Sequence, residues 1–121
     1  MSHTILAVDD SPSMRRMVAH VLTSGGYAVL EAADGEEALH LALANRVDAV
    51  LTDQNMPKMD GIALVKRLRA LDGYSHTPIM LLTTESSPEM KQKGRAAGAT
   101  GWMVKPFDPE RLLEMFARIL P

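Results

Sequence analysis

Short, mainly apolar runs alternate along the chain with longer segments in which apolar residues recur at helical spacing. Runs of this length and character are typical of strands that are buried on both faces of a sheet. We therefore predict strands at residues 5–8, 28–31, 49–52, 79–82 and 101–104.

Each predicted strand is followed by a predicted helix, because a capping signal begins each intervening segment. The signals are Ser11-Pro12, Asp34 with Glu37, Asp60-Gly61, Ser87-Pro88 and Asp108-Pro109. The apolar face of the first helix contains Met14, Met17, Val18, Val21 and Leu22. The last helix has a similar stripe, formed by Leu112, Leu113, Phe116, Ile119 and Leu120. The fourth helix is polar apart from Met90 and its alanines, so we expect it to be weakly anchored.

The alternation of strand and helix determines the fold class. Parallel strands joined by right-handed helical crossovers carry helices on both faces of the sheet. We therefore predict a doubly wound, three-layer α/β domain with a five-stranded parallel sheet. The chain has 121 residues, enough for one ordinary core, so residues 1–121 are expected to form a single domain.

The composition argues against several functions. Lysine plus arginine total 13 against 15 acidic residues, without a basic run, so nucleic-acid binding is not expected. The absence of cysteine excludes a thiol nucleophile and fits a reducing compartment. No apolar stretch reaches the length of a secretion signal or a membrane span, so we expect a cytoplasmic protein without membrane contact.

Polar residues stand where four of the five predicted strands end. They are the pair Asp9-Asp10, Asp53, Thr83 and Lys105. The carboxyl ends of parallel strands share one edge of the sheet, so these side chains are predicted to converge in one crevice. Three carboxylates there would repel one another unless a cation lies among them, and Mg²⁺ prefers such oxygen ligands.

This set of residues suits phosphoryl transfer. Asp53 could attack the phosphorus, Mg²⁺ and Lys105 could neutralise the developing charge, and Thr83 could donate to a phosphoryl oxygen. Each residue alone is more often a solvated surface residue. The inference depends on their joint placement at the ends of four strands.

Four segments resemble the two-component response regulator receiver domains. They are Val8-Asp9-Asp10, residues 53–57 with Asp60-Gly61, Thr83-Thr84-Glu85, and Lys105-Pro106-Phe107. The resemblance extends over essentially the whole chain, and it implies a flavodoxin-like sheet with strand order 2-1-3-4-5. Asn55 and Glu85 are most similar to the residues of stand-alone chemotaxis regulators, in which these two positions modulate turnover of the phosphate.

The resemblance also implies roles for the crevice residues. Asp53 would accept phosphate from a histidine kinase and Lys105 would contact it. Mg²⁺ would be held by Asp9, Asp10, Asp53 and the main-chain carbonyl of Asn55. A cis peptide bond between Lys105 and Pro106 is implied as well.

In this family, activation moves the hydroxyl at the Thr83 position toward the phosphoryl group and an aromatic residue at the Trp102 position inward. Trp102 departs from the usual tyrosine, phenylalanine or histidine. Its bulkier side chain would need more space and a partner for the indole N–H in order to rotate fully inward. Thr84 is larger than the residue of many relatives, and its methyl group could slow the access of a phosphodonor or water to the crevice. The alternative for Trp102 is an exposed aromatic residue on the last strand.

The resemblance implies a monomeric signalling module that catalyses its own phosphorylation and dephosphorylation and is not an enzyme acting on other substrates. Its partners would be a histidine kinase and a downstream target such as a flagellar motor switch, reached through the fourth helix, fifth strand and fifth helix. Pro12, Met14 and Arg15 stand where related proteins dock their kinase, and an exposed helix turn is the alternative.

Two other functions stay open. One is an Mg²⁺-dependent phosphohydrolase with an aspartyl-phosphate, although such enzymes typically carry Asp-x-Asp after the first strand and here Asp9 and Asp10 are adjacent. The other is an interaction domain that works without phosphorylation.

Overall fold

The computed structural model describes residues 3–85 and 87–120 and has the predicted alternation of strands and helices. The strands are β1 (Thr4–Val8), β2 (Ala28–Ala32), β3 (Ala49–Asp53), β4 (Ile79–Thr83) and β5 (Gly101–Val104). The helices are α1 (Pro12–Ser24), α2 (Gly35–Ala44), α3 (Gly61–Arg69), α4 (Pro88–Ala97) and α5 (Pro109–Ile119). All strand pairs are parallel, and the order in the sheet is β2-β1-β3-β4-β5, as the resemblance implied.

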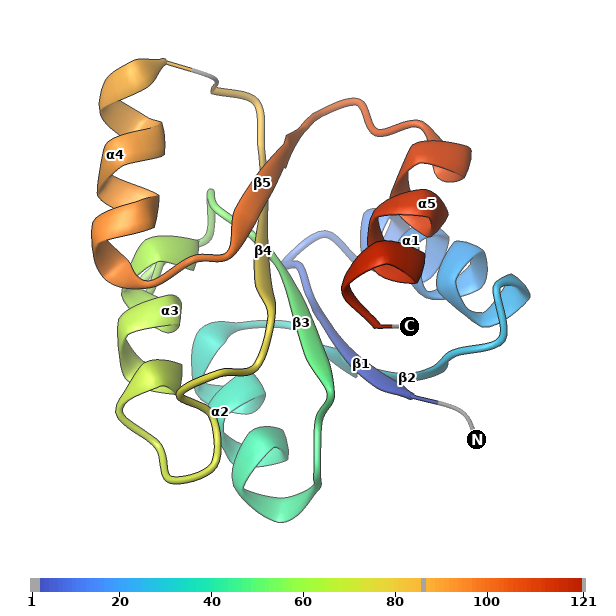
Figure 1. The fold of residues 1–121 in the computed structure, drawn as a ribbon, viewed down its shortest axis with the longest axis horizontal. Coiled ribbons are helices and arrows are strands. Elements are labelled where there is room, and N and C mark those ends of the chain that lie inside the picture. Colours follow the sequence, from blue (N-terminus) through green and yellow to red (C-terminus); the bar gives the residue numbers. More distant parts are fainter. Residues whose placement is uncertain (1–2, 86, 121) are drawn as a thin grey trace.

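Helices cover both faces of the sheet (Figure 1). Helices α1 and α5 lie on one face, where Leu22 and Phe116 are fully buried against inward residues of the strands. Helices α2, α3 and α4 lie on the other face and pack over a second core that includes Leu64 and Leu68. Successive strand residues point to opposite faces, so Leu6 belongs to one core and Ile5 to the other. This arrangement confirms the three-layer prediction.

The strands β1 to β4 are each one residue longer than the apolar pattern indicated, and in β3 and β4 the additional residue is a functional candidate. Asp53 is the last residue of β3 and pairs with Leu82, and Thr83 is the last residue of β4 and pairs with Val104. The pattern ended too early because both residues are polar, although the neighbouring backbones still pair there. Both functional candidates therefore belong to the sheet itself and not to the loops that follow.

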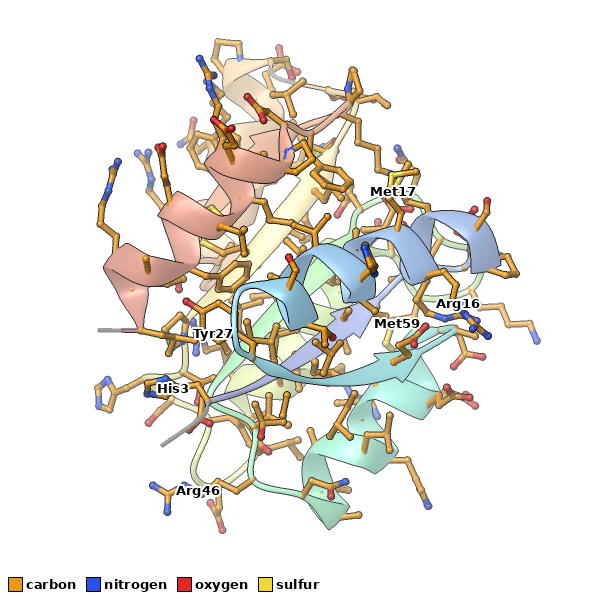
Figure 2. All side chains as sticks on the ribbon, turned by 90° about the vertical axis from the view of Figure 1, so that its right-hand side faces the viewer. His3, Arg16, Met17, Tyr27, Arg46 and Met59 are labelled. Atoms are coloured by element: carbon orange, nitrogen blue, oxygen red, sulfur yellow. The ribbon has the colours of Figure 1, made fainter. Side chains whose placement is uncertain are left out.

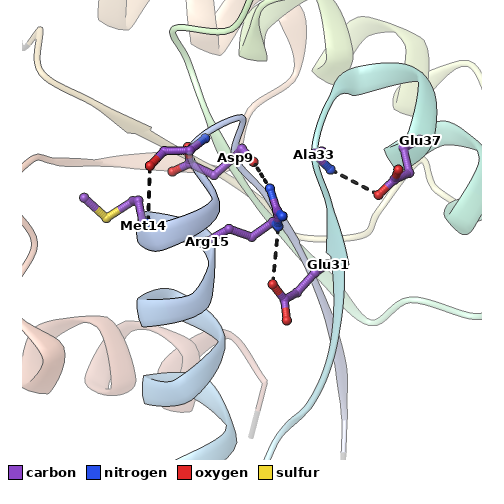
Figure 3. A network of polar contacts seen from close by, with 7 residues as sticks. Asp9, Met14, Arg15, Glu31, Ala33 and Glu37 are labelled. Carbon is purple, nitrogen blue, oxygen red and sulfur yellow. Dashed lines mark hydrogen bonds and ion pairs between the residues drawn. The ribbon is translucent and has the colours of Figure 1, made fainter.

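The predicted helix starts carry the expected caps. The Ser11 hydroxyl accepts from Met14 N, and Asp34 Oδ1 accepts from Glu37 N at 2.8 Å. Glu37 reaches back one residue further than a capping box requires, because its carboxylate accepts from Ala33 N at 3.1 Å (Figure 3). These bonds satisfy N–H groups that a helix start leaves without partners.

Met17 is a correction to the predicted apolar face of α1. The buried residues of this helix are Val18, Ala19, Val21 and Leu22, whereas the Met17 side chain is 53% exposed (Figure 2). Residues 17 and 19 are about 200° apart around a helix, so one face cannot bury both. Met17 therefore lies on the outer surface of the α1 side of the molecule.

Helix α4 buries only Gly94 and Ala97, in agreement with the weak anchoring expected from its polar sequence. Its C-terminal end is nevertheless held by Arg69 of α3. The guanidinium donates to the carbonyls of Gly98, Tyr74 and Thr77 at 2.7–2.9 Å, and burial lowers the pKa of Arg69. The sequence pattern gave no sign of this contact.

None of the helices that the structure describes is both long enough and apolar enough to cross a membrane.

Candidate functional site

The predicted site residues meet at the carboxyl edge of the sheet. Asp9 and Asp10 follow β1, Asp53 ends β3, Thr83 ends β4 and Lys105 follows β5. Because β1 and β3 are neighbours in the sheet, oxygen atoms of Asp9, Asp10 and Asp53 lie within 4.8 Å of one another. The strand order, and not closeness in the sequence, brings these carboxylates together.

Asp9 is held through nearly all of its hydrogen-bonding groups. Its side chain is buried, its N–H donates to Ala32 O at 3.1 Å, and its Oδ1 accepts from Ser11 N at 2.9 Å. Its carbonyl accepts from Arg15 Nη1 at 2.8 Å (Figure 3). Only Oδ2 is left, a buried oxygen without a hydrogen-bond partner among the described residues.

Burial raises the pKa of the Asp9 carboxyl above its ordinary value. The Ser11 N–H and Lys105 oppose this rise, while the neighbouring Asp53 and Asp10 carboxylates add to it. Without a metal, ionisation of Asp9 is therefore less favourable than ionisation of a free carboxyl group.

Asp53 is 4% exposed, and Lys105 Nζ lies 2.7 Å from its Oδ1. No hydrogen bond with acceptable angles reaches that oxygen in the described residues, so the contact is an ion pair of short range. The Lys105–Pro106 peptide bond is cis, as the resemblance implied. The lysine ammonium therefore stands directly beside the predicted phosphoacceptor.

The donors at this edge fit a magnesium ion. Mg²⁺ takes carboxylate and carbonyl oxygens in octahedral geometry and keeps several waters. The cluster supplies carboxylates from the carboxyl ends of β1 and β3. One buried oxygen of Asp9 has no hydrogen-bond partner among the described residues, and Asp10 is exposed, which leaves room for water. Asn55 is exposed in the loop after β3, and the role of its carbonyl stays a prediction.

Thr83 is buried, and its Oγ1 accepts from Glu85 N at 3.0 Å. This bond uses an acceptor lone pair, so the hydroxyl proton remains available to an incoming oxygen. Thr84 and Glu85 are exposed at the rim. Their positions are compatible with the predicted influence on access and turnover, which no contact tests.

Trp102 is half-buried on β5 and is not the exposed aromatic residue of the alternative interpretation. It packs against the core on the α3 and α4 side, and Lys91 Nζ and Arg95 Cζ lie 5.1 and 5.8 Å from its ring centroid. Trp102 and Thr83 line one small cavity together with Gln54, Leu81, Glu85, Met90 and Lys91. The two predicted switch residues therefore face a shared space.

The roles of Gln54 and Gly61 were not predicted from the amino-acid sequence. Gln54 is buried; its Oε1 accepts from Ile62 N at 2.8 Å and its carbonyl accepts from Gly61 N. A Cβ at Gly61 would lie 2.7 Å from the Asp53 carbonyl oxygen. The start of α3 therefore packs directly on the backbone of the predicted phosphoacceptor, and the Asp60-Gly61 pair was the only available signal.

Comparison with known proteins identifies the family. Residues 5–117 match the model of the response regulator receiver domain. The chain belongs to this family. The receiver domain is 42% identical over 118 residues to a chemotaxis protein CheY homolog of Campylobacter jejuni, covering 96% of this chain and 91% of that protein.

Solved structures agree with this assignment. The receiver domain superposes on Vibrio cholerae CheY4 with a TM-score of 0.96 and 53% identity, over 99% of this chain and 100% of that one. The receiver domain of the sensor histidine kinase PA1611 of Pseudomonas aeruginosa gives 0.89 at 30% identity, over 98% and 97% of the two chains. That structure contains a magnesium ion coordinated in its active site cleft. The chain is thus a CheY-like receiver domain of the two-component response regulators.

Proposed function

We propose that this receiver domain is a phosphorylation-dependent switch in which Asp53 accepts a phosphoryl group from a phosphohistidine of a histidine kinase. The observation that carries the proposal is the buried Asp53 carboxylate, with Lys105 Nζ 2.7 Å from Oδ1 and the Asp9 and Asp10 carboxylates beside it. A carboxylate nucleophile that has both an ammonium group and potential metal ligands beside it is suited to phosphoryl transfer.

In the proposed reaction a carboxylate oxygen of Asp53 attacks phosphorus as the bond to the donor nitrogen breaks. Lys105 leaves its ion pair with Asp53 and follows the charge to a phosphoryl oxygen, and the Thr83 hydroxyl donates to another. Asp9, Asp10, Asp53 and the Asn55 carbonyl would hold Mg²⁺, which supplies positive charge against the phosphoryl oxygens. The unpartnered Asp9 Oδ2 supports this ligand set.

Output is proposed to follow from the movement of Thr83 toward the phosphate. This movement would open the cavity that Thr83 shares with Trp102, so that the indole shifts inward and the surface of α4, β5 and α5 changes. A downstream target, with a flagellar motor switch as the leading candidate, would bind that surface. The domain would act as a monomer within residues 1–121, and Asn55 and Glu85 at the rim would set the rate of its own dephosphorylation.

The proposal is tested by intact mass after incubation with a small-molecule phosphodonor, with and without Mg²⁺, on the wild type and on Asp53→Asn. We expect one phosphoryl adduct that requires Mg²⁺ and is absent from the variant. The absence of any adduct from the folded, Mg²⁺-bound wild type would exclude the phosphorylation mechanism and favour an interaction domain that works without it.

A further inference from the structure

We propose that Arg15 is a positioning residue that fixes Asp9 as a ligand for the magnesium ion, an inference that rests on the proposed function of the acidic cluster. Arg15 reaches from the first turn of α1 back to the end of β1 and across to β2 (Figure 3). Its Nη1 donates to the Asp9 carbonyl at 2.8 Å, and its Nε lies 3.3 Å from Glu31 Oε1. One planar guanidinium thus connects three elements of the fold.

The Arg15 contact completes the fixation of Asp9. The N–H of Asp9 is bound to Ala32 O, its Oδ1 accepts from Ser11 N, and its carbonyl is bound by Arg15. These three bonds restrict the directions in which the side chain can present Oδ2. Oδ2 is the buried oxygen without a partner, and it belongs to the cluster with Asp10 and Asp53.

The bond to the Asp9 carbonyl matters more than the pair with Glu31. The Glu31 side chain is 36% exposed, and an exposed ion pair contributes little because water screens it. The Arg15 side chain is only 19% exposed, and its bond to a carbonyl at the end of a buried strand is protected. Glu31 mainly helps to hold the guanidinium in the orientation in which Nη1 donates to the Asp9 carbonyl.

The consequence is a defined effect on metal binding. Without Arg15 the Asp9 carbonyl loses its donor at the point where the chain turns from β1 toward α1, so Asp9 can rotate and Oδ2 is no longer preoriented. Partners that orient metal ligands typically change metal affinity by about 10- to 100-fold when they are removed. We expect the lower end of that range for Arg15, because Ser11 N still holds Oδ1.

The chain offers a matched control in Arg16. Arg16 is the next residue of α1 and is exposed (Figure 2). Its side chain forms no hydrogen bond or ion pair within the described part of the chain. Arg16→Ala removes the same charge and side chain from the same helix turn without touching Asp9. Any general effect of net charge or helix propensity appears equally in both variants.

The experiment measures the Mg²⁺ dissociation constant of the unphosphorylated protein by calorimetry for the wild type, Arg15→Ala, Arg15→Lys and Arg16→Ala. We expect an increase of about tenfold for Arg15→Ala and no change beyond twofold for Arg16→Ala. Arg15→Lys should recover part of the affinity, because an ammonium can still donate to the Asp9 carbonyl but lacks the planar fork that also meets Glu31. It also keeps the test valid should Arg15→Ala fail to fold.

A second readout separates positioning from a loss of folded protein. The Mg²⁺ concentration that gives half of the maximal phosphorylation rate with a small-molecule donor should rise in Arg15→Ala, while the rate at saturating Mg²⁺ stays within about twofold of wild type. A merely structural role would lower the maximal rate and leave the half-saturating concentration unchanged, which would overturn the inference.

Other outcomes are equally decisive. If the wild type binds Mg²⁺ and both Arg15 variants bind it as tightly, the positioning role is wrong while the proposed function stands. A kinase-docking role for Arg15 would give that same result, since no kinase is present. If the wild type itself binds no Mg²⁺, the inference and the magnesium part of the proposed function both fail.

Discussion

At the scale of single residues, the candidate site combines buried carboxylates with one lysine ammonium group. Asp9 and Asp53 are each 4% exposed, and Lys105 Nζ lies 2.7 Å from Asp53 Oδ1. Buried carboxylates without a counter-charge are costly, so the crevice is held ready for a cation and is less stable without one. The residue-scale predictions concern two of these charged groups.

Replacement of Lys105 by alanine should slow phosphorylation without preventing it. The ammonium 2.7 Å from Asp53 Oδ1 is the positive side chain placed to follow charge onto the phosphoryl group. Loss of one such electrostatic contact typically costs about 100-fold or more in rate. The initial rate of adduct formation at saturating Mg²⁺ measures this effect, and Lys66→Ala, at an exposed site on α3, serves as the control. Equal rates for the two variants would exclude a catalytic role for Lys105.

Replacement of Asp9 by asparagine should stabilise the metal-free protein at neutral pH. A carboxyl whose pKa is raised by folding binds more protons in the folded state, so its contribution to stability falls as pH rises above the ordinary pKa of 3.8. Asparagine removes that penalty. Urea unfolding in a chelator should show Asp9→Asn as the more stable protein at pH 7, with the difference shrinking as pH falls toward 3.8.

The corresponding control is Asp72→Asn, at an exposed position in the loop before β4. It should leave the free energy of unfolding nearly unchanged at both pH values. A stability gain in Asp9→Asn that is independent of pH would contradict the role assigned to ionised Asp9.

At the scale of elements, the start of α3 determines where the phosphoacceptor lies. Gly61 N donates to Gln54 O, and Gln54 Oε1 accepts from Ile62 N, so the loop after β3 is bound to the first turn of the helix. Gly61 is buried, and its missing side chain allows the helix to approach the Asp53 carbonyl closely. The position of α3 and the position of Asp53 are therefore coupled.

Gly61→Ala should destabilise the domain by about 1–3 kcal/mol and slow phosphorylation, because overpacking forces the backbone to move. The added Cβ would lie 2.7 Å from Asp53 O and 2.9 Å from Gln54 Cα, which are both backbone atoms. Gly94→Ala in α4 is the matched control. Its Cβ would lie 3.0 Å from Leu81 Cδ1, at the end of a side chain that can shift, and at an ordinary contact distance of 4.0 Å from Ala99 Cβ.

The change in the free energy of unfolding should therefore differ in sign or size between Gly61→Ala and Gly94→Ala. In Gly94→Ala, the gain of about 0.5–1 kcal/mol from replacing glycine in a helix offsets the tight contact. Urea unfolding of both variants gives the comparison. Equal losses of stability would show that the close packing of α3 on Asp53 has no special importance.

At the scale of the whole molecule, β4 and β5 connect the candidate site with the proposed output surface of α4, β5 and α5. Thr83 and Trp102 line the same cavity, and Lys91 and Arg95 of α4 cover the indole ring. Cation–π contacts of this kind are worth about 0.5–2 kcal/mol, so they bias the ring position without locking it. Under the proposed mechanism, a change at Asp53 would reach α4 through Thr83 and Trp102.

Trp102 is the single tryptophan of the chain, so its fluorescence reports on this coupling. Phosphorylation in the presence of Mg²⁺ should change the emission of the wild type, because the indole moves relative to Lys91 and Arg95 and to solvent. Asp53→Asn should show no change under the same conditions. An unchanged emission in protein that carries the phosphoryl adduct would mean that Trp102 does not take part in the switch.

The fold class, and the residues that gather at the candidate site, could be predicted from the amino-acid sequence. Strand and helix periodicity, and the caps at Ser11 and Asp34, depend on residues only a few positions apart, so they can be read from the chain. Asp9, Asp53 and Lys105 were identified because polar residues at the ends of buried strands must meet at one edge of a parallel sheet.

Contacts between elements could not be predicted from the sequence and are known only from the folded structure. Three contacts join residues from different elements: the ion pair of Lys105 with Asp53, the bond of Arg15 to the Asp9 carbonyl, and the packing of half-buried Trp102 against Lys91 of α4. Such contacts depend on sheet register, helix position and rotamers, which are set by packing of the whole domain. Met17 is an example of a wrong local prediction. Its helical spacing predicted burial, but the packed orientation of α1 leaves it exposed.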